Sequence, residues 1–142
     1  MKAIITLLFS SLVLLASETN HLQVKILETI ITNIHLDKNI VVWSDNKNLL
    51  AELKKHNVLL TTNICEDATV IILQDKRKLE KECSSKHIFV LNYNSLSHVP
   101  QSFGALFWKK GRPNIVLIEP RIKSQLIKIS KDLEPYLEER VW

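Results

Sequence analysis

Glycine is scarce in this sequence, which has only two glycines among 142 residues. Phosphate- and dinucleotide-binding loops need several glycines, because their backbone N–H groups must approach the ligand closely. The sequence also contains no G-x-S-x-G, H-E-x-x-H or C-x-x-C motif. These motifs mark hydrolases, metalloproteases and thiol oxidoreductases. We therefore expect a protein that is not an enzyme and that holds no cofactor.

The titratable side chains show no spacing that is typical of a metal site or an acid–base pair. No two histidines lie three or four residues apart, which is the spacing of metal ligands on one helix. The adjacent carboxylates Glu66 and Asp67 point apart on a helix or strand. We expect no metal. His56 is expected at a helix end, where its charge would favour the helix dipole, and Glu119 is expected to form an ion pair with Arg121.

The charge of the chain is only mildly positive. Lysine and arginine number 19 against 15 aspartate and glutamate residues, and removal of Lys2 lowers this excess by one. Nucleic-acid-binding domains carry a larger and more clustered positive charge. We therefore expect no nucleic acid partner, and nothing in the sequence predicts the oligomeric state.

Residues 1–17 have the pattern of a secretory signal peptide. Lys2 precedes an apolar run over residues 3–16, and small and polar residues follow. The run is shorter than the roughly 20 residues that a transmembrane helix needs, so an uncleaved anchor is the less favoured alternative. Cleavage after Ser17 would leave residues 18–142 as one periplasmic domain, and cleavage after Ala16 would leave one residue more. We expect this domain to contact the membrane only through a partner.

Strand and helix patterns alternate between residues 21 and 93. Short β-branched runs predict strands over residues 39–44, 58–62, 68–74 and 87–93. Apolar residues at helical spacing predict helices over residues 21–36, 46–56 and 76–85. Ser44 or Asp45 is expected to cap the second of these helices. The alternation predicts a three-layer, Rossmann-like α/β domain with a mainly parallel sheet.

The last part of the chain departs from this alternation. Two strand patterns, over residues 102–108 and 114–119, are separated only by K-K-G-R-P. This gap predicts an antiparallel β-hairpin with a bulged loop, in which Gly111 takes a positive φ. Pro113 is expected to be the first residue of the second strand, because it has no N–H group for the ladder.

The segment after the hairpin is expected to contain one more helix. Ser130-Lys131-Asp132 can open this helix, with Pro135 tolerated in its first turn. Trp142 is expected to be packed, because large aromatic side chains are mostly buried.

The predicted hairpin loop carries three positive charges, on Lys109, Lys110 and Arg112. A basic turn explains them, since charges at an exposed tip keep a hairpin soluble. The alternative is a partner- or anion-binding role. A phosphate loop is not indicated, because the segment has one glycine and leads into a strand rather than a helix.

Polar residues follow the ends of the predicted parallel strands. They include Asp45, Asp75, Asn92 and Asn94. The carboxyl ends of parallel strands meet at one edge of a sheet, where α/β proteins bind small molecules. The same residue types also cap helices and form turns. A small-molecule-binding sensor or a solute-binding domain is therefore one hypothesis for the function.

The two cysteines, Cys65 and Cys83, can approach each other through the predicted elements. The strand between them rises about 20 Å at roughly 3.3 Å per residue. The helix that follows returns about 12 Å at 1.5 Å per residue, so both cysteines end near the same edge. In an oxidising compartment such a pair tends to form a disulfide. Two buried free thiols, or one thiol that responds to redox state, are the alternatives.

Three segments of the chain resemble those of a known family. They are NIVVW, CEDATVIIL, and FGALFW followed by GRPNIVLIEPRIKSQLIKIS. Together they resemble the YfiR-like family of bacterial periplasmic proteins. Gly104-Ala105-Leu106 stands where the family has its hairpin glycine, Gly111-Arg112 occupies the turn, and Ile129-Ser130-Lys131 stands near a later motif of the family.

The resemblance implies a regulatory function. YfiR-like proteins are thought to bind the periplasmic sensor domain of an inner-membrane diguanylate cyclase and to hold its activity down until redox or envelope stress releases them. For this chain the resemblance implies that the partner is an inner-membrane signalling protein. It also implies that the cysteine pair is structural or redox-sensing, and that the binding surface includes exposed apolar and charged positions of the hairpin and of the C-terminal region.

Overall fold

The structure is a computed structural model, and it describes residues 20–142. The predicted signal peptide lies outside the described residues. Among the residues that are described, no helix is both long and apolar enough to cross a membrane.

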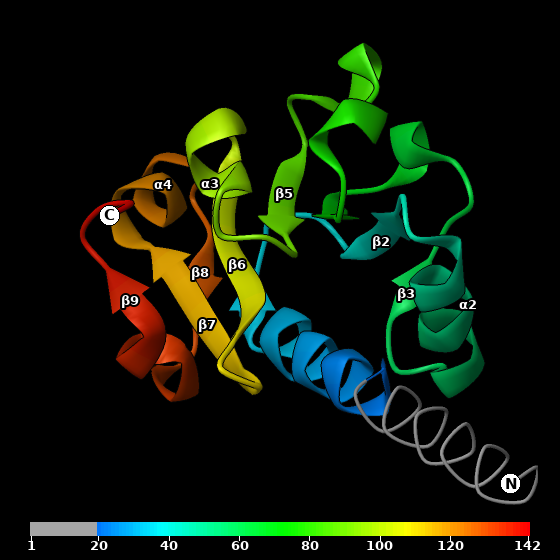
Figure 1. The fold of residues 1–142 in the computed structure, drawn as a ribbon. Coiled ribbons are helices and arrows are strands. Elements are labelled where there is room, and N and C mark those ends of the chain that lie inside the picture. The colour runs from blue at the N-terminus through cyan, green and yellow to red at the C-terminus, as the bar shows by residue number, and fades with distance from the viewer. Residues whose placement is uncertain (1–19) are drawn as a thin grey trace, which may run out of the picture.

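A seven-stranded sheet organises the molecule, with the strand order β3-β2-β4-β5-β6-β7-β9 (Figure 1). The strands are β2 (Val41–Ser44), β3 (Leu60–Thr61), β4 (Val70–Leu73), β5 (His87–Val90), β6 (Ser102–Lys109), β7 (Arg112–Ile118) and β9 (Leu137–Glu138). The five strands from β3 to β6 are parallel, and β7 is antiparallel to β6 and parallel to β9. The prediction of an α/β fold with a mainly parallel sheet and a C-terminal hairpin is therefore confirmed.

Apolar side chains of the central strand β4 enter both faces of the sheet. Val70 and Ile72 belong to one hydrophobic cluster, together with residues of the N-terminal helix and of α2 (Lys47–His56). Ile71 and Leu73 belong to a second cluster, together with residues of α3 (Ser95–His98) and both cysteines. Successive side chains of a strand point to opposite faces, so the continuous apolar run of β4 reflects burial on both sides.

The parallel strands follow a doubly wound order. From β2 the chain moves to β3 on one side, and then to β4, β5 and β6 in turn on the other side. This is the flavodoxin-like order, and its topological switch point lies between β2 and β4. The carboxyl ends of these two strands are therefore the expected place for a ligand crevice.

Several local predictions are wrong. The N-terminal helix ends at residue 32, and Ile34–His35 form β1, which pairs with β8 (Lys128–Ile129). The predicted helix over residues 76–85 is replaced by two short 3₁₀ turns, η2 (Lys76–Lys78) and η3 (Lys81–Cys83). A helix that was not predicted, α4 (Glu119–Ser124), follows β7.

The C-terminal segment also differs from its prediction. After Ser130 the chain forms the 3₁₀ segment η4 (Lys131–Tyr136) rather than an α-helix, with Pro135 inside it. Trp142 is 72% exposed, so the prediction that it is packed is wrong. Its indole N–H donates to the carboxylate of Glu138 at 3.5 Å. Its backbone N–H donates to the hydroxyl of Tyr93 at 2.9 Å, and the guanidinium of Arg140 lies 4.0 Å from the centre of the indole ring.

The β6–β7 hairpin has a tighter loop than the predicted bulge. Lys109 pairs with Arg112, so only Lys110 and Gly111 form the loop. Both have positive φ, at 51° and 74°, which is the geometry of a type I′ turn. Pro113 is the second residue of β7 and not the first. It is tolerated because β9 pairs with β7 only at Leu117 and Ile118.

Candidate functional site at the carboxyl edge of the sheet

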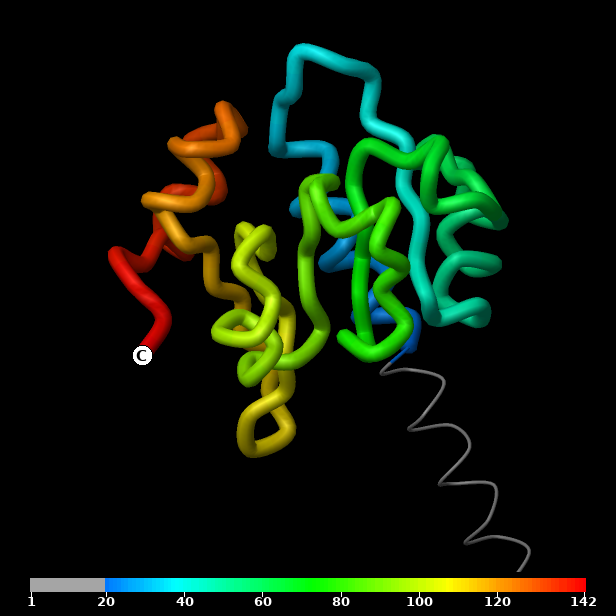
Figure 2. Tube along the Cα trace, turned by 90° about the horizontal axis from the view of Figure 1, so that it is seen from above, coloured from blue at the N-terminus to red at the C-terminus, as the bar shows by residue number. Residues whose placement is uncertain are grey.

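The β6–β7 hairpin projects beyond the rest of the sheet. Val90, the last residue of β5, pairs with Ala105, and β6 continues to Lys109. At roughly 3.3 Å per residue these four additional residues carry the hairpin about 13 Å past the end of β5. Figure 2 shows the hairpin in yellow, extending past the neighbouring strands.

The end of this hairpin, which we call the basic tip, consists of Lys109, Lys110 and Arg112. All three side chains are exposed, and none forms an ion pair with another residue in the part of the chain that the structure describes. Trp108, which directly precedes the tip, is 37% exposed. The tip therefore presents unpaired positive charge beside an accessible aromatic ring.

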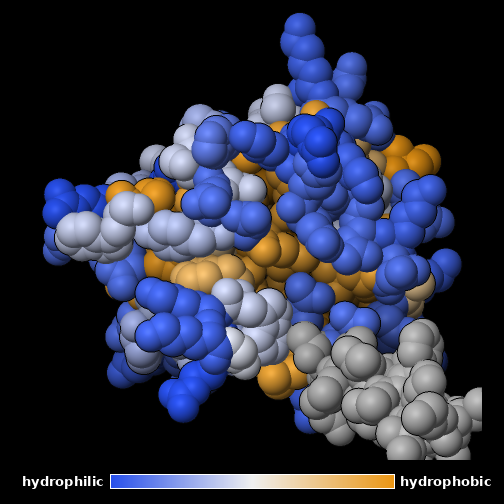
Figure 3. Space-filling model, in the orientation of Figure 1, coloured by the Kyte–Doolittle hydropathy of each residue, from blue (hydrophilic) through white to orange (hydrophobic). Residues whose placement is uncertain are grey.

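The surface beside the hairpin combines polar and apolar side chains. Figure 3 shows apolar side chains in a hollow on the face seen in Figure 1, with hydrophilic side chains around them. Phe107 and Tyr93 pack edge to face, with their ring centres 5.1 Å apart, and both are partly buried. Aromatic side chains and arginine are enriched at protein-binding surfaces.

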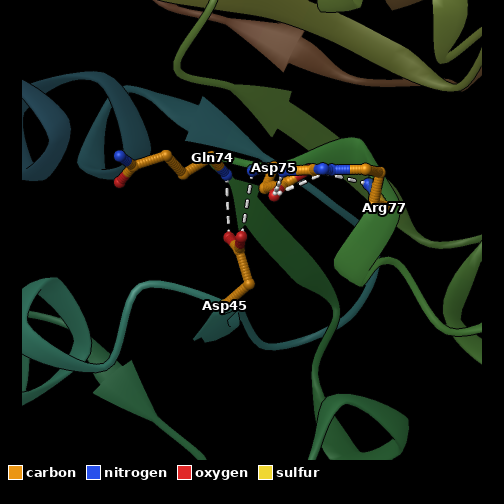
Figure 4. A network of polar contacts seen from close by, with 4 residues as sticks. All are labelled: Asp45, Gln74, Asp75 and Arg77. Atoms are coloured by element: carbon orange, nitrogen blue, oxygen red, sulfur yellow. Dashed lines mark hydrogen bonds and ion pairs between the residues drawn. The ribbon is translucent and has the colours of Figure 1, made fainter.

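The switch point between β2 and β4 is closed by the protein's own carboxylate. Asp45 follows β2, and its two oxygens accept hydrogen bonds from the backbone N–H groups of Gln74 and Asp75, at 2.7 and 2.9 Å (Figure 4). Asn46, not Ser44 or Asp45, caps α2, because its side chain accepts from the N–H of Leu49 at 3.0 Å. Asp45 instead clamps the loop after β4 to the loop after β2. The N–H groups of Gln74 and Asp75 are therefore already used by the protein itself.

Asp75 also has a local structural role. Its carboxylate caps η2 by accepting from the backbone N–H of Arg77 at 3.0 Å, and it accepts from the guanidinium of Arg77 at 2.8 Å. These hydrogen bonds from the side chain and backbone of Arg77 lower the pKa of Asp75 to about 2. Helix and turn capping, the alternative interpretation of these polar residues, is thus what the structure shows for Asp75.

Three of the four predicted crevice residues do come together. Asp75, Asn92 and Asn94 line an open cavity of about 530 Å³, together with Gln74, Lys76, Ser95 and His98. Asp45 lies in a different hollow, beside Trp43 and Lys54. Asn92 accepts from the backbone N–H of Asn94 at 2.8 Å. The cavity is therefore polar and formed mostly by loops, and Asp45 is not part of it.

The predicted disulfide is present. Cys65 and Cys83 are bonded, with their Cα atoms 6.1 Å apart. The bond joins the 3₁₀ turn η1 (Cys65–Asp67) to η3, and the two cysteines are 3% and 0% exposed. A disulfide is compatible with an oxidising, extracytoplasmic location. Among the described residues, one group of potential metal ligands comes together around this bond, formed by Cys65, Glu66, Glu80 and Cys83.

His56 has a partner that the sequence pattern did not reveal. It ends α2, as predicted, but its Nδ1 lies 2.9 Å from Oε1 of Glu28, a carboxylate on the N-terminal helix that is only 7% exposed. The ring of His21 lies near that of His56, with 5.9 Å between their centres. This contact between helices is a partly buried structural pair, and only the tertiary fold brings its members together.

The predicted Glu119–Arg121 ion pair is wrong. Glu119 pairs with Lys123 one helical turn later, at 2.7 Å. The guanidinium of Arg121 points instead into the protein and donates to the backbone oxygens of Leu96 and Ser102, at 2.7 and 3.0 Å. Burial lowers the pKa of Arg121. Arg121 therefore joins α4 to the start of β6 and to α3.

Comparisons with known proteins leave the family open. No family model matches the sequence, and neither a curated protein nor a solved structure matches the chain significantly. The resemblance to the YfiR-like family is not tested by these results and stays a prediction.

Proposed function

We propose that this protein is a non-enzymatic binding protein of the bacterial periplasm that docks on a membrane signalling protein through the basic tip. The observation that carries the proposal is the projection of Lys109, Lys110 and Arg112 about 13 Å beyond the end of β5, at 3.3 Å per residue. An exposed, unpaired cluster of one sign favours a partner surface of the opposite sign. We therefore propose an acidic docking surface on the partner.

The hairpin suits docking because it is ordered before binding. Its two-residue loop matches the twist of the strands, and the pairing of β6 with β7 continues from Gly104 to Lys109. At Gly104 the strand β6 pairs with both β5 and β7, so the base of the hairpin is held on both sides. A preorganised element loses little conformational entropy on binding, so few contacts at the tip suffice for recognition.

The class of partner follows from the family resemblance. A YfiR-like protein would bind the periplasmic sensor domain of an inner-membrane diguanylate cyclase and restrain it. The disulfide supports an oxidising compartment, which is compatible with the periplasm. The proposed activity is therefore binding, with the enzymatic step performed by the partner.

The test is a crosslinked pull-down of the tagged protein from cell envelopes, read by mass spectrometry. The wild-type protein is expected to recover a membrane protein with a periplasmic sensor domain. Lys109→Glu/Arg112→Glu is expected to lower that recovery about tenfold, which corresponds to roughly 0.7 kcal/mol for each reversed charge. Lys110 is left unchanged because of its positive φ. Higher salt should weaken the wild-type interaction.

The matched control is Lys38→Glu/Lys81→Glu, which changes the net charge equally at two exposed positions, before β2 and on η3. It should recover the partner as well as the wild type does. Equal losses in both variants would show that overall charge and not the tip determines binding. Recovery of no membrane protein by the wild type would refute the docking proposal.

A second candidate function, small-molecule binding, is favoured by the cavity near Asp75, Asn92 and Asn94. Its volume of about 530 Å³ lies within the range of small-molecule sites. A ligand that binds only the folded protein must raise the melting temperature. A thermal-shift screen of sugars, amino acids and small anions tests this function. Shifts that Asn92→Ala abolishes would support it, and the absence of any shift would exclude it for those ligands.

A further inference from the structure

We propose that the reduced protein binds one Zn²⁺ ion through Cys65, Cys83, Glu66 and Glu80. Each residue offers one ligand atom, and the four atoms all lie within 4.8 Å of one another. This site is independent of the proposed docking function, because it lies on η1 and η3 and not on the hairpin.

The four atoms are close enough to surround one zinc ion once the bond between the two sulfur atoms is broken. Zinc binds sulfur at about 2.3 Å and carboxylate oxygen at about 2.0 to 2.2 Å, so neighbouring ligand atoms of a tetrahedron lie about 3.3 to 3.8 Å apart. Sγ of Cys65 and Oε2 of Glu80 are already 3.5 Å apart. Other pairs of ligand atoms, at most 4.8 Å apart, must approach by up to about 1 Å. The two sulfur atoms, now bonded to each other, must move apart to the spacing of the tetrahedron.

Local structure explains why these residues face one another. Glu80 precedes η3, and the backbone N–H of Cys83 donates to its carbonyl oxygen at 3.0 Å. In a 3₁₀ turn the side chains of residues i and i+3 lie on the same side, so Glu80 and Cys83 point together. Cys65 and Glu66 begin η1, which packs beside η3.

The burial of the four residues suits a zinc site, because the thiolate ligands lie in the interior and the carboxylate ligands are open to solvent, from which the ion can enter. The two cysteines are buried, whereas Glu66 and Glu80 are exposed. A zinc ion would therefore lie near the protein surface, between the buried sulfur atoms and the exposed carboxylates. The ammonium group of Lys86 donates to the backbone oxygen of Glu66 at 2.8 Å, and its charge would offset part of the negative charge of the ligand set.

The site opens only when the disulfide is reduced. A small dithiol attacks one sulfur of the protein disulfide through its thiolate, the S–S bond breaks, and a mixed disulfide forms. The second thiol of the reagent then displaces the protein sulfur, so the dithiol becomes a cyclic disulfide and the protein gains two electrons and two protons. Zinc binding releases the two thiol protons to water and holds both cysteines as thiolates. The disulfide and the zinc site are therefore alternative states of the same residues.

The experiment compares zinc binding by the oxidised and reduced protein. The chain is reduced with dithiothreitol, separated from the reagent without oxygen, and titrated with Zn²⁺ against a chromophoric chelator. We expect each reduced chain to take one Zn²⁺ ion from the chelator. We expect the oxidised chain to take none. Co²⁺ in place of Zn²⁺ should give the strong visible absorption of a tetrahedral site and the ultraviolet band of cobalt–thiolate bonds.

Variants separate this site from binding by thiols alone. Glu80→Gln and Glu66→Gln are each expected to weaken zinc binding at least about tenfold. Glu82→Gln is the control, because Glu82 is an exposed residue of η3 that lies outside the group; its affinity should stay within about twofold of wild type. Wild-type affinity in both glutamine variants would overturn the proposal.

Two further results would also overturn it. The first is a reduced wild-type chain that binds no zinc. The second is a reduced chain that loses its circular dichroism and does not regain it when zinc is added, since the site requires the folded arrangement of η1 and η3.

Discussion

The clamp formed by Asp45 can be tested by removing its carboxylate. In Asp45→Ala the backbone N–H groups of Gln74 and Asp75 lose the acceptors that now lie 2.7 and 2.9 Å away. Hydrogen bonds to a charged group contribute about 1.5 to 3 kcal/mol each. Asp45 is only half-buried, so water replaces part of both bonds. We expect the free energy of unfolding to fall by about 2 to 3 kcal/mol in total.

Urea unfolding at 25 °C measures this loss. With a slope of about 1 to 3 kcal/mol per molar urea, the midpoint of Asp45→Ala should fall by roughly 1 to 2 M. Asp45→Asn should lose less, because its amide oxygen still accepts one of the two bonds. Asp132→Ala is the control, since it removes one negative charge from an exposed position of η4.

Formate provides a second measurement. It is a carboxylate without a side chain, and it should occupy the two N–H groups that the alanine leaves free. Replacing chloride with formate at constant ionic strength should therefore stabilise Asp45→Ala, but not the wild type or the control. A loss below about 1 kcal/mol in Asp45→Ala, or equal formate effects in all three proteins, would refute the clamp.

Two further predictions concern the core and the loop after β4. Gly104→Ala is expected to lower the free energy of unfolding by about 2 to 3 kcal/mol, because an added Cβ would lie 2.6 Å from the backbone oxygen of Val116. Gly111→Ala meets no atom within 4 Å and should lose only about 1 kcal/mol, from its positive φ; equal losses in urea unfolding would contradict this explanation. The pKa of Asp75 is lowered from 3.8 to about 2, so its stabilising contribution is present above the unfolded value and is lost as the pH falls through about 2. Arg77→Gln should return this pKa toward 3.8 in an NMR titration, and an unchanged pKa would show that Arg77 is not the cause.

The parts of the fold that were predictable are those with a strong local pattern. The V-I-I-L run of β4 is apolar at every position, and burial on both faces of a sheet is the simplest explanation of such a run. The K-K-G-R-P gap between two apolar strands indicates a hairpin in the same way, although it did not predict the two-residue loop. The cysteine pair was predictable because the chain returns to the same edge of the sheet after β4, although two 3₁₀ turns and not the predicted helix make this return.

The wrong predictions arose where tertiary contacts override local preference. The sequence K-R-K-L-E-K-E-C has residues with high helix propensity, but Leu79 and Cys83 alone give it too small an apolar face to stabilise a helix by packing. Asp75 and the disulfide instead hold this segment in two short turns. Likewise, Ile34 continues the helical spacing of its segment, and only its partner Ile129 explains why it is in a strand.

The candidate site was predictable only in its position. Polar residues at strand ends indicated the carboxyl edge of the sheet, and Asp75, Asn92 and Asn94 do line one cavity there. The pattern could not tell which polar groups bind the protein's own backbone, and Asp45 is one that does. The partly buried pair of Glu28 and His56 was missed for a related reason, since its members belong to helices that only packing brings together.

The pairing of β1 with β8 determines when the fold can be completed. Ile34 pairs with Ile129, and the side chain of Ser130 donates to that of Asn33 at 2.8 Å. During synthesis the N-terminal part of the chain appears first. All five parallel strands must therefore be made before β8 is available to pair with β1. Contacts so distant in sequence form slowly. Full protection of this helix against proteolysis should thus appear last in refolding, and removal of residues 128–142 should leave it open to attack.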